Sequence, residues 1–161
     1  MKGHMLASRY RLLIVVAVLA ALIPSAWAMS QPELTDVDIE FSVDREETLK
    51  FMKWYDEIEL TPEQEAVRVE ALEAIPAACC NNFSAATCCC ECNMSRTIWG
   101  LSKHLIVNEG WDAVQVRSAV TKYYAAVNPA GFSGDSCFTG GCMKPMAHNG
   151  CGGMQKHMLI D

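Results

Sequence analysis

Apolar residues recur at intervals of three and four positions in four separate stretches of this chain, which is the spacing of a single helix face. The stretches run over residues 44–57, 61–75, 95–108 and 112–127. Polar and charged residues occupy most of the positions between them, as expected for helices that bury one side. The pattern predicts an all-α fold, a small three- to four-helix bundle.

Start signals accompany the second and fourth predicted helices. Thr61 precedes Pro62 and is followed by Gln64, so a capping box coincides with a proline at the first helical position. Asp112 and Gln115 form a second capping box. The residues expected to face the core are Val67, Ala71, Leu72, Ile75, Ile98, Leu101, Leu105, Ile106, Val116, Val120, Tyr124 and Val127.

Two further regions lack any apolar period. Residues 76–94 form a cysteine-rich hairpin loop, and structureless loops of this length usually carry a function. Residues 131–161 form an irregular tail rich in Gly, Cys and Met, with glycine at seven of its first 23 positions. No strand is predicted anywhere in the chain.

The first 28 residues have the layout of a secretory signal peptide. Lys2, Arg9 and Arg11 precede an uncharged apolar run over residues 12–23, and residues 26–28 read Ala-Trp-Ala, a small-x-small cleavage site. The apolar run is shorter than the roughly 20 residues of a spanning helix. We therefore expect export to the bacterial periplasm or cell envelope. The alternative is an uncleaved signal anchor, and only in that case do we expect the protein to be attached to a membrane.

The predicted organisation has four parts. A signal peptide over residues 1–28 precedes a flexible acidic leader over residues 29–43. A helical domain that includes the cysteine-rich loop covers residues 44–130, and a Cys/Met/His-rich tail covers residues 131–161.

The charge balance argues against one class of partner. The chain carries 13 Lys and Arg against 19 Asp and Glu, a formal charge of −6. Cleavage after residue 28 removes three basic residues and no acidic one, which leaves 10 against 19, or −9. Because an acidic surface repels phosphate backbones, no nucleic-acid partner is expected.

Six of the nine cysteines lie within the 14 residues from Cys79 to Cys92. Three of them, Cys88, Cys90 and Cys92, form a C-x-C-x-C motif whose side chains converge if the segment is extended. An exported location permits disulfides. An odd number of cysteines nevertheless leaves at least one thiol for metal ligation or exchange.

A thiol-rich set of ligands selects soft ions such as Cu(I) or Zn over hard cations. The C-x-C-x-C motif supplies the primary candidate ligands. Further candidates lie before the motif and in the tail, where thiol, thioether and imidazole groups are mixed: Cys79, Cys80, Cys142, Met146, His148 and Cys151. No C-x-x-C-H motif is present, so covalent haem is not expected.

The string from Cys88 to Met94, followed by two short helices separated at Glu109-Gly110, resembles bacterial CcmH-type domains and their C-x-C-x-C-containing relatives. The matching stretch runs from Thr61 to Phe132. The resemblance implies a three-helix bundle with a cysteine hairpin after its first helix, and thiol–disulfide chemistry in cytochrome c maturation. It assigns the redox role to Cys89 and Cys92.

Extra cysteines separate this chain from the CcmH pattern. Cys88 directly precedes the C-x-x-C pair and Cys90 lies inside it, Cys79 and Cys80 come earlier, and the tail adds three more. These additions argue against a plain dithiol reductase. The C-x-C-x-C relatives fit the motif better, but their resemblance implies no settled activity.

Three functions stay open. The first is metal binding through the C-x-C-x-C motif in metalloprotein or cytochrome assembly, with a thiol or metalloprotein client in the envelope. The second is a thiol–disulfide oxidoreductase, and the third is a disulfide-stapled structural or accessory subunit of an envelope complex. In each case we expect Cys137, Cys142 and Cys151 to tie the tail to the bundle or to a shared metal.

Overall fold

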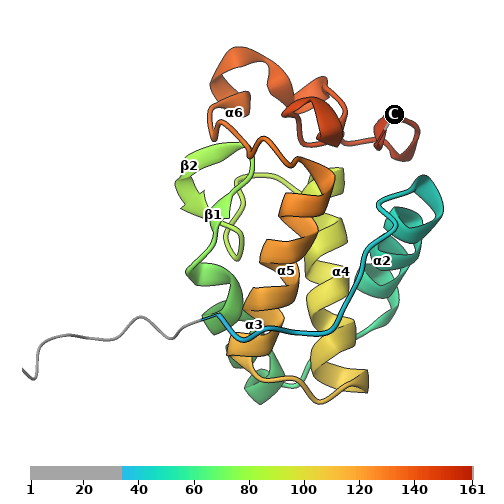
Figure 1. Ribbon diagram of the computed structural model, residues 1–161, viewed down its shortest axis with the longest axis vertical. Helices are drawn as coiled ribbons and strands as arrows, with labels where there is room; N and C mark the ends of the chain where they lie inside the picture. The colour runs from blue at the N-terminus through green and yellow to red at the C-terminus, as the bar shows by residue number, and fades with distance from the viewer. Residues whose placement is uncertain (1–33, 161) are drawn as a thin grey trace, which may run out of the picture. The chain divides into compact units, whose positions relative to one another are not determined.

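The computed structural model describes residues 34–160. The predicted signal peptide and residues 29–33 of the predicted leader lie outside this part of the chain. The body is formed by helices α2 (Arg45–Glu57), α3 (Pro62–Glu73), α4 (Asn93–Asn108) and α5 (Ala113–Val127) (Figure 1). Strands β1 (Pro76–Ala77) and β2 (Cys80–Ser84) lie between α3 and α4. The tail contains α6 (Ser136–Thr139), η1 (Gly141–Met143), η2 (Met146–His148) and η3 (Lys156–Met158).

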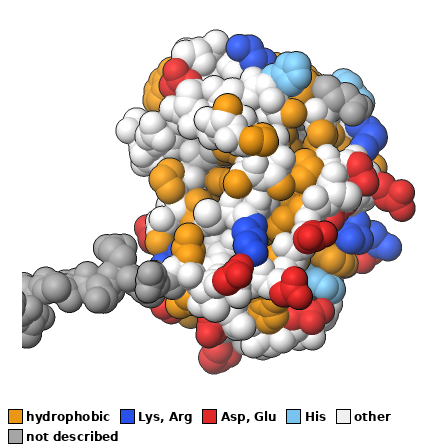
Figure 2. All heavy atoms as spheres, viewed as in Figure 1, with side chains coloured by type: hydrophobic (Ala, Val, Ile, Leu, Met, Phe, Trp, Pro, Cys, Tyr) orange, Lys and Arg blue, Asp and Glu red, His pale blue; other side chains and the backbone are white. Residues whose placement is uncertain are grey.

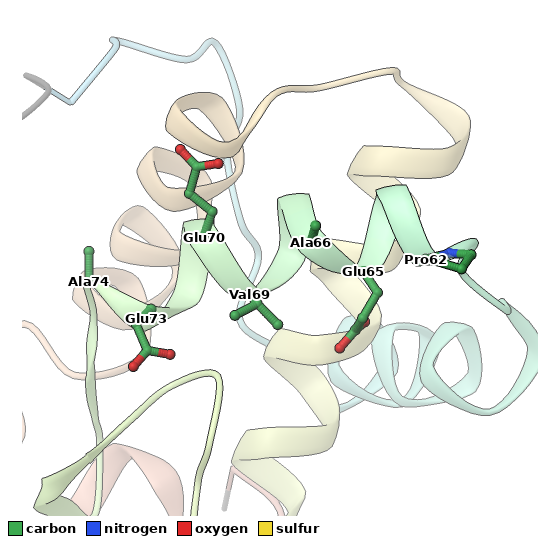
Figure 3. Close-up of a pocket in the computed structure, with 7 residues that line it drawn as sticks. All are labelled: Pro62, Glu65, Ala66, Val69, Glu70, Glu73 and Ala74. Carbon is green, nitrogen blue, oxygen red and sulfur yellow. The ribbon is translucent and has the colours of Figure 1, made fainter.

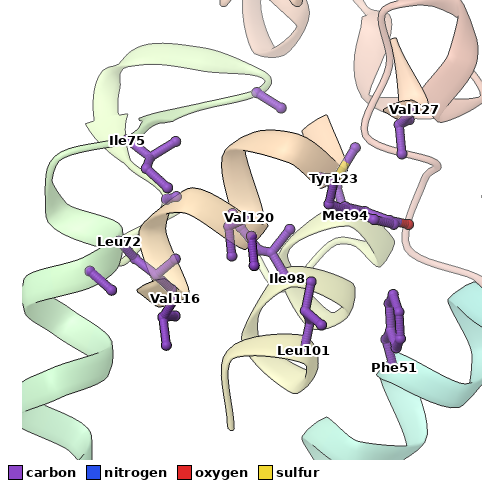
Figure 4. Packing of buried hydrophobic residues seen from close by; sticks show 14 of the residues in the cluster. Phe51, Leu72, Ile75, Met94, Ile98, Leu101, Val116, Val120, Tyr123 and Val127 are labelled. Atoms are coloured by element: carbon purple, nitrogen blue, oxygen red, sulfur yellow. The ribbon is translucent and has the colours of Figure 1, made fainter. Parts of the chain in front are cut away.

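Helix α4 is the centre of the bundle, because it packs against α2, α3 and α5. Ile98 and Leu101 on its apolar face are buried in one core cluster with Phe51 of α2, Leu72 of α3 and Val120 of α5, which Figure 4 labels. Most of the predicted core positions are confirmed. The buried ones are Ala71, Leu72, Ile75, Ile98, Leu101, Leu105, Ile106, Val116, Val120 and Val127.

The close approach of α2 and α4 depends on Gly100. A Cβ atom at this position would lie 1.8 Å from the backbone oxygen of Phe51 and 2.8 Å from the backbone nitrogen of Tyr55. Neither backbone atom can move without shifting α2. A side chain at residue 100 is therefore incompatible with this helix pair.

Both predicted capping boxes are present. The Thr61 hydroxyl accepts the N–H of Gln64 at 3.3 Å, and the Gln64 side chain accepts the N–H of Thr61 at 3.0 Å. The Asp112 carboxylate accepts the N–H groups of Val114 and Gln115, both at 2.9 Å. These bonds satisfy donors that have no partner within the helix, so α3 and α5 begin where the sequence predicts.

Two predicted core positions are wrong in detail. Tyr123, rather than Tyr124, is fully buried, with its ring centroid 5.2 Å from that of Phe41 and 5.7 Å from that of Phe51. Tyr124 and Val67 are only partly buried and pack at the edge of the core. Neighbouring residues on a helix differ by 100° in direction, and the apolar period around Tyr123 and Tyr124 does not resolve that difference.

The all-α prediction is correct only in its main part. The chain is mostly helical, but β1 and β2 pair as a small antiparallel sheet with an irregular register, Ala77 opposite Cys80 and Pro76 opposite Ser84. Residues 80–84 show one buried position followed by exposed ones, so they carry no alternating pattern. The pairing follows from the tight turn at residues 77–80 and not from an apolar face.

The part of the predicted flexible leader that the structure describes packs on the bundle. Val37 is buried, and Ile39, Phe41 and Val43 lie against the core. Lys122 on α5 donates a hydrogen bond to the carboxylate of Asp36 and to the Val37 carbonyl. Apolar residues at every second position from Val37 to Val43 are the signal for this extended contact, which the prediction of flexibility overlooked.

The tail also differs from the irregular appendage that its composition predicted. It folds into short helical turns, and Met146, Cys151 and Leu159 are completely buried. Figure 1 shows the tail folded back over the ends of the helices where α5 ends and α4 begins. Glycine has no side chain to pack, so the tail is held on the bundle by these buried apolar side chains.

The outer faces of the helices are polar. Acidic residues occupy the first turns of α2 and α3, and Figure 2 shows acidic side chains spread over one face of the bundle. Among residues 34–160, no helix combines the length and the apolar character needed to cross a membrane.

Candidate metal centre

Three segments that are distant in sequence bring their cysteines together. The hairpin and its following loop contribute Cys79 and residues 88–90, Cys92 is the N-cap of α4, and the tail contributes its three cysteines. The backbone N–H of Cys137 donates to the Cys79 carbonyl at 3.0 Å, and that of Asn81 donates to the Gly134 carbonyl at 2.8 Å. These two bonds align the start of α6 with β2.

The start of α4 fixes the last part of the tail. The N–H groups of Asn93 and Met94 donate to the carbonyls of Gly153 and Cys151, at 2.9 and 3.1 Å. The Asn93 side-chain amide adds bonds to the carbonyls of Gly152, at 2.6 Å, and Gln155, at 2.7 Å. Because Asn93 is fully buried, these bonds hold Cys151 beside Cys92.

The sulfur atoms form two groups of three. Cys88, Cys90 and Cys92, the loop triad, have all their Sγ atoms within 4.8 Å of one another, as the C-x-C-x-C spacing predicted. A second group, the tail triad, consists of Cys79, Cys89 and Cys137, and its Sγ atoms meet the same limit. Each triad offers one ligand atom per residue in a geometry that can hold a metal ion.

The two triads are continuous with each other. The Cys79 Sγ atom lies 3.9 Å from that of Cys88 and 3.6 Å from that of Cys137. Cys142 lies 3.8 Å from Cys137, and the Cys151 thiol contacts both Cys79 and the loop triad. Eight cysteines therefore form one thiol network: Cys79, Cys88, Cys89, Cys90, Cys92, Cys137, Cys142 and Cys151.

The separations within the thiol network match those of sulfurs that share a metal. The closest Sγ pairs lie 3.5 to 3.9 Å apart, and all nine cysteines are free thiols. Two thiolates bound to one tetrahedral Zn with bonds of about 2.3 Å are roughly 3.8 Å apart, and a trigonal site with the same bonds gives roughly 4.0 Å. A thiophilic ion therefore fits between these sulfurs with little rearrangement.

Burial changes across the network. Cys79, Cys92 and Cys151 are buried, whereas Cys89 is exposed. Beside the network, Phe138 and Met143 of the tail are exposed apolar side chains. The network is thus open to solvent at Cys89 of the tail triad, and no cysteine of the loop triad is exposed.

Cys92 is placed to be a thiolate. As the N-cap of α4 it lies where the helix dipole favours negative charge. Hydrogen bonds from the thiols of Cys151 and Cys88, and then from Ser95, hold the pKa of Cys92 far below that of an ordinary thiol, although burial acts in the opposite direction. The thiolate is the form that ligates a metal.

Other thiols of the network hold their protons more tightly. Burial, together with the charge of Cys92, raises the pKa of Cys90 to about 12. Burial and a hydrogen bond with Cys89 raise the pKa of Cys137 to about 12. An ion that enters must therefore displace protons, and its affinity is expected to fall as the pH falls.

The structure separates the residues that the sequence proposed as ligands. Cys142 and Cys151 join the thiol network, but Cys80 is in neither triad although it is buried. Met146 lies in the apolar core, and His148 is exposed on η2. Cys80 and His148 belong to neither triad, and the part of Met146 in metal binding stays a prediction.

The proposed redox pair is divided between the two triads. Cys92 belongs to the loop triad, and Cys89 belongs to the tail triad with its Sγ atom 3.5 Å from that of Cys137. The sequence analysis did not propose Cys89 as a metal ligand, and it named Cys137 only among the tail cysteines expected to tie the tail to the bundle or to a shared metal. No local spacing links Cys137 to the loop, since 45 residues separate it from Cys92 and only the folded tail brings it there.

A shallow groove along α3 offers no comparable chemistry. Figure 3 shows its lining residues, Pro62, Glu65, Ala66, Val69, Glu70, Glu73 and Ala74. It contains small apolar side chains and carboxylates but no cysteine or histidine. Glu65 is already paired with Arg68. The groove is not a candidate catalytic or metal site.

Neither protein-family models, nor curated proteins, nor solved structures show a match to this chain. The CcmH-type resemblance therefore stays a prediction. The geometry of the thiol network is therefore the basis for proposing a function.

Proposed function

We propose that this protein is exported and binds a thiophilic metal ion, Cu(I) or Zn, through the loop triad of Cys88, Cys90 and Cys92. The convergence of these three sulfurs within 4.8 Å is the observation that carries the proposal. Cys92 lies in a setting that stabilises its thiolate, so one ligand is prepared before the ion arrives.

Cu(I) fits the loop triad better than Zn does. Structural Zn sites use four ligands, and the fourth would have to come from Cys79 or Cys151 of the neighbouring network. Soft thiolate sets select Cu(I), and an ion with three sulfur ligands is complete within the triad. The role we propose is delivery or storage of the ion for metalloprotein or cytochrome assembly in the cell envelope.

Metal content tests this proposal directly. The full chain is purified anaerobically with reductant, incubated with excess Cu(I) complex, desalted and analysed for copper. We expect about one copper per chain or more, because a preformed thiolate site retains its ion through desalting. The triple variant Cys88→Ser/Cys90→Ser/Cys92→Ser is expected to lose most of it, whereas Cys80→Ser retains it. Less than about a tenth of an equivalent in the unmodified chain would rule the proposal out.

Thiol–disulfide exchange is a second candidate, favoured by the exposure of Cys89 beside Cys137. In this function the Cys89 thiolate attacks a client disulfide and releases one client thiolate. The Cys137 thiolate then attacks the mixed disulfide, which releases the second client thiolate and leaves a Cys89–Cys137 disulfide. A Cys137→Ser variant would accumulate the mixed disulfide, and its absence with several disulfide substrates would exclude this function.

A further inference from the structure

We infer that the thiol network is one polynuclear centre, in which an ion at the loop triad and an ion at the tail triad are joined by Cys79 acting as a bridging thiolate. The inference extends the proposed function from a single site to a cluster and depends on it. The metal ion at both positions is Cu(I).

The position of Cys79 is the first argument. Cys79 is a member of the tail triad, and its sulfur is also 3.9 Å from that of Cys88 in the loop triad. A separation of this size is close to the roughly 4.0 Å expected for two thiolates on one trigonal ion. One sulfur therefore lies within ligand distance of two separate metal positions.

The number of sulfurs is the second argument. A single thiophilic ion takes at most about four protein ligands, and the connected thiol network contains twice that number. Cys142 lies 3.8 Å from Cys137 of the tail triad, and Cys151 contacts Cys92 of the loop triad and Cys79 of the tail triad. The surplus sulfurs are arranged around a second position, not scattered over the surface.

The exposure of the tail triad gives the two positions different roles. Cys89 of the tail triad is exposed, whereas no cysteine of the loop triad is exposed. The ion at the tail triad is therefore the one that a competing ligand reaches first. The loop triad holds the more slowly exchanging ion.

Titration of Cu(I) into the reduced full chain under anaerobic conditions, with a chromogenic Cu(I) chelator as competitor, counts the ions. We expect at least about two equivalents to resist the competitor, and copper X-ray absorption of the loaded protein to show a short Cu–Cu scattering path. One equivalent without this path would overturn the inference and leave the proposed function standing. No bound copper would overturn both.

Adjacent cysteines provide a matched pair of variants. Cys79→Ser is expected to remove the Cu–Cu path and at least one equivalent, because serine is a poor bridge for a soft ion. Cys80→Ser, next to it and outside both triads, is expected to keep both. The exposed-side variant Cys89→Ser, in which folding is not at risk, should lose one equivalent and retain the slowly exchanging ion. Full stoichiometry and an intact Cu–Cu path in both Cys79→Ser and Cys89→Ser would contradict the bridged cluster.

Discussion

Adjacent cysteines can have entirely different environments. Cys79 contacts sulfurs of both triads, while Cys80 is buried next to it in neither triad. Both residues are cysteines, so the direction of each side chain decides whether it joins the thiol network. Sequence alone proposes both cysteines as ligands, because no pattern at this hairpin indicates which of the two faces the thiol network.

Cys92 is the ligand on which the loop triad depends most, since it combines burial with a stabilised thiolate. Replacement by serine is expected to weaken Cu(I) binding by more than about 100-fold, beyond the range seen when only a supporting group is lost. The Kd is measured by competition with a chromogenic chelator. Cys80→Ser is the control, and equal weakening in the two variants would show that the effect comes from folding.

We expect His104, which is remote from the thiols, to make the stability of the protein depend on pH. Its ring stacks on Trp54 with centroids 3.7 Å apart, and this burial lowers the pKa of His104 despite the nearby carboxylate of Glu109. A lowered pKa means that the unfolded chain binds the proton first. Stability is therefore complete above about pH 6.5 and declines as the pH falls towards the folded-state pKa.

Denaturant unfolding of the metal-free protein at about pH 7.5 and about pH 5.5 measures this effect. His104→Gln should lose less stability between the two values than the unmodified chain does. His148→Gln, at an exposed position, should behave like the unmodified chain. An unchanged pH dependence in His104→Gln would contradict the assignment.

At the scale of the elements, the helices are the part that sequence predicts best. Their apolar period and the capping residues Thr61 and Asp112 define α3 and α5 almost completely, because these signals are local. The β1–β2 hairpin is too short to carry a period. The tail derives its order from contacts with Asn93 and from buried residues such as Met146, which no local pattern reveals.

The contact of α2 with α4 predicts a large effect of a small substitution. Gly100→Ala places a methyl group against the backbone of Phe51. Because overpacking a core typically costs about 1–3 kcal/mol, we expect the free energy of unfolding to fall by about 3 kcal/mol or more. Urea unfolding followed by circular dichroism gives the value. Val107→Ala, on a more exposed part of the same helix, should cost much less, and equal losses would contradict the close approach.

We expect the side-chain hydrogen bonds of Asn93 to hold the tail against the start of α4. Asn93→Ala removes two hydrogen bonds from buried or partly buried positions and leaves the carbonyls of Gly152 and Gln155 without that partner. Each lost bond is expected to cost about 1–3 kcal/mol and to expose the tail to protease. Limited proteolysis of the metal-free chain should release a tail fragment faster from Asn93→Ala than from Asn82→Ala, an exposed control. Equal rates would show that Asn93 does not hold the tail.

For the whole molecule, the central feature is the meeting of the hairpin loop, the start of α4 and the tail at one thiol network. The sequence predicts the loop triad, because C-x-C-x-C spacing places three cysteines within five residues, and the structure brings their sulfurs together. It does not predict the tail triad, which depends on how residues 131–160 fold back. Half of the candidate site is therefore local and half is a property of the tertiary fold.

The same arrangement explains why the protein tolerates so many free thiols near one another. Burial, with a smaller contribution from the neighbouring sulfurs, raises the pKa values of Cys90 and Cys137, so a thiolate at either position carries a cost in the metal-free protein. A bound cation reverses it, since binding to the folded state alone stabilises that state. Metal binding is expected to be coupled to the stability of the tail and hairpin together.

Copper X-ray absorption spectroscopy of the Cu(I)-loaded, desalted full chain tests the central claim most directly, because it identifies the atoms bound to the metal. The account predicts a first shell made of sulfur alone, with about three sulfurs per copper as the loop triad supplies. A first shell dominated by nitrogen or oxygen, as from His148 or surface carboxylates, would contradict it.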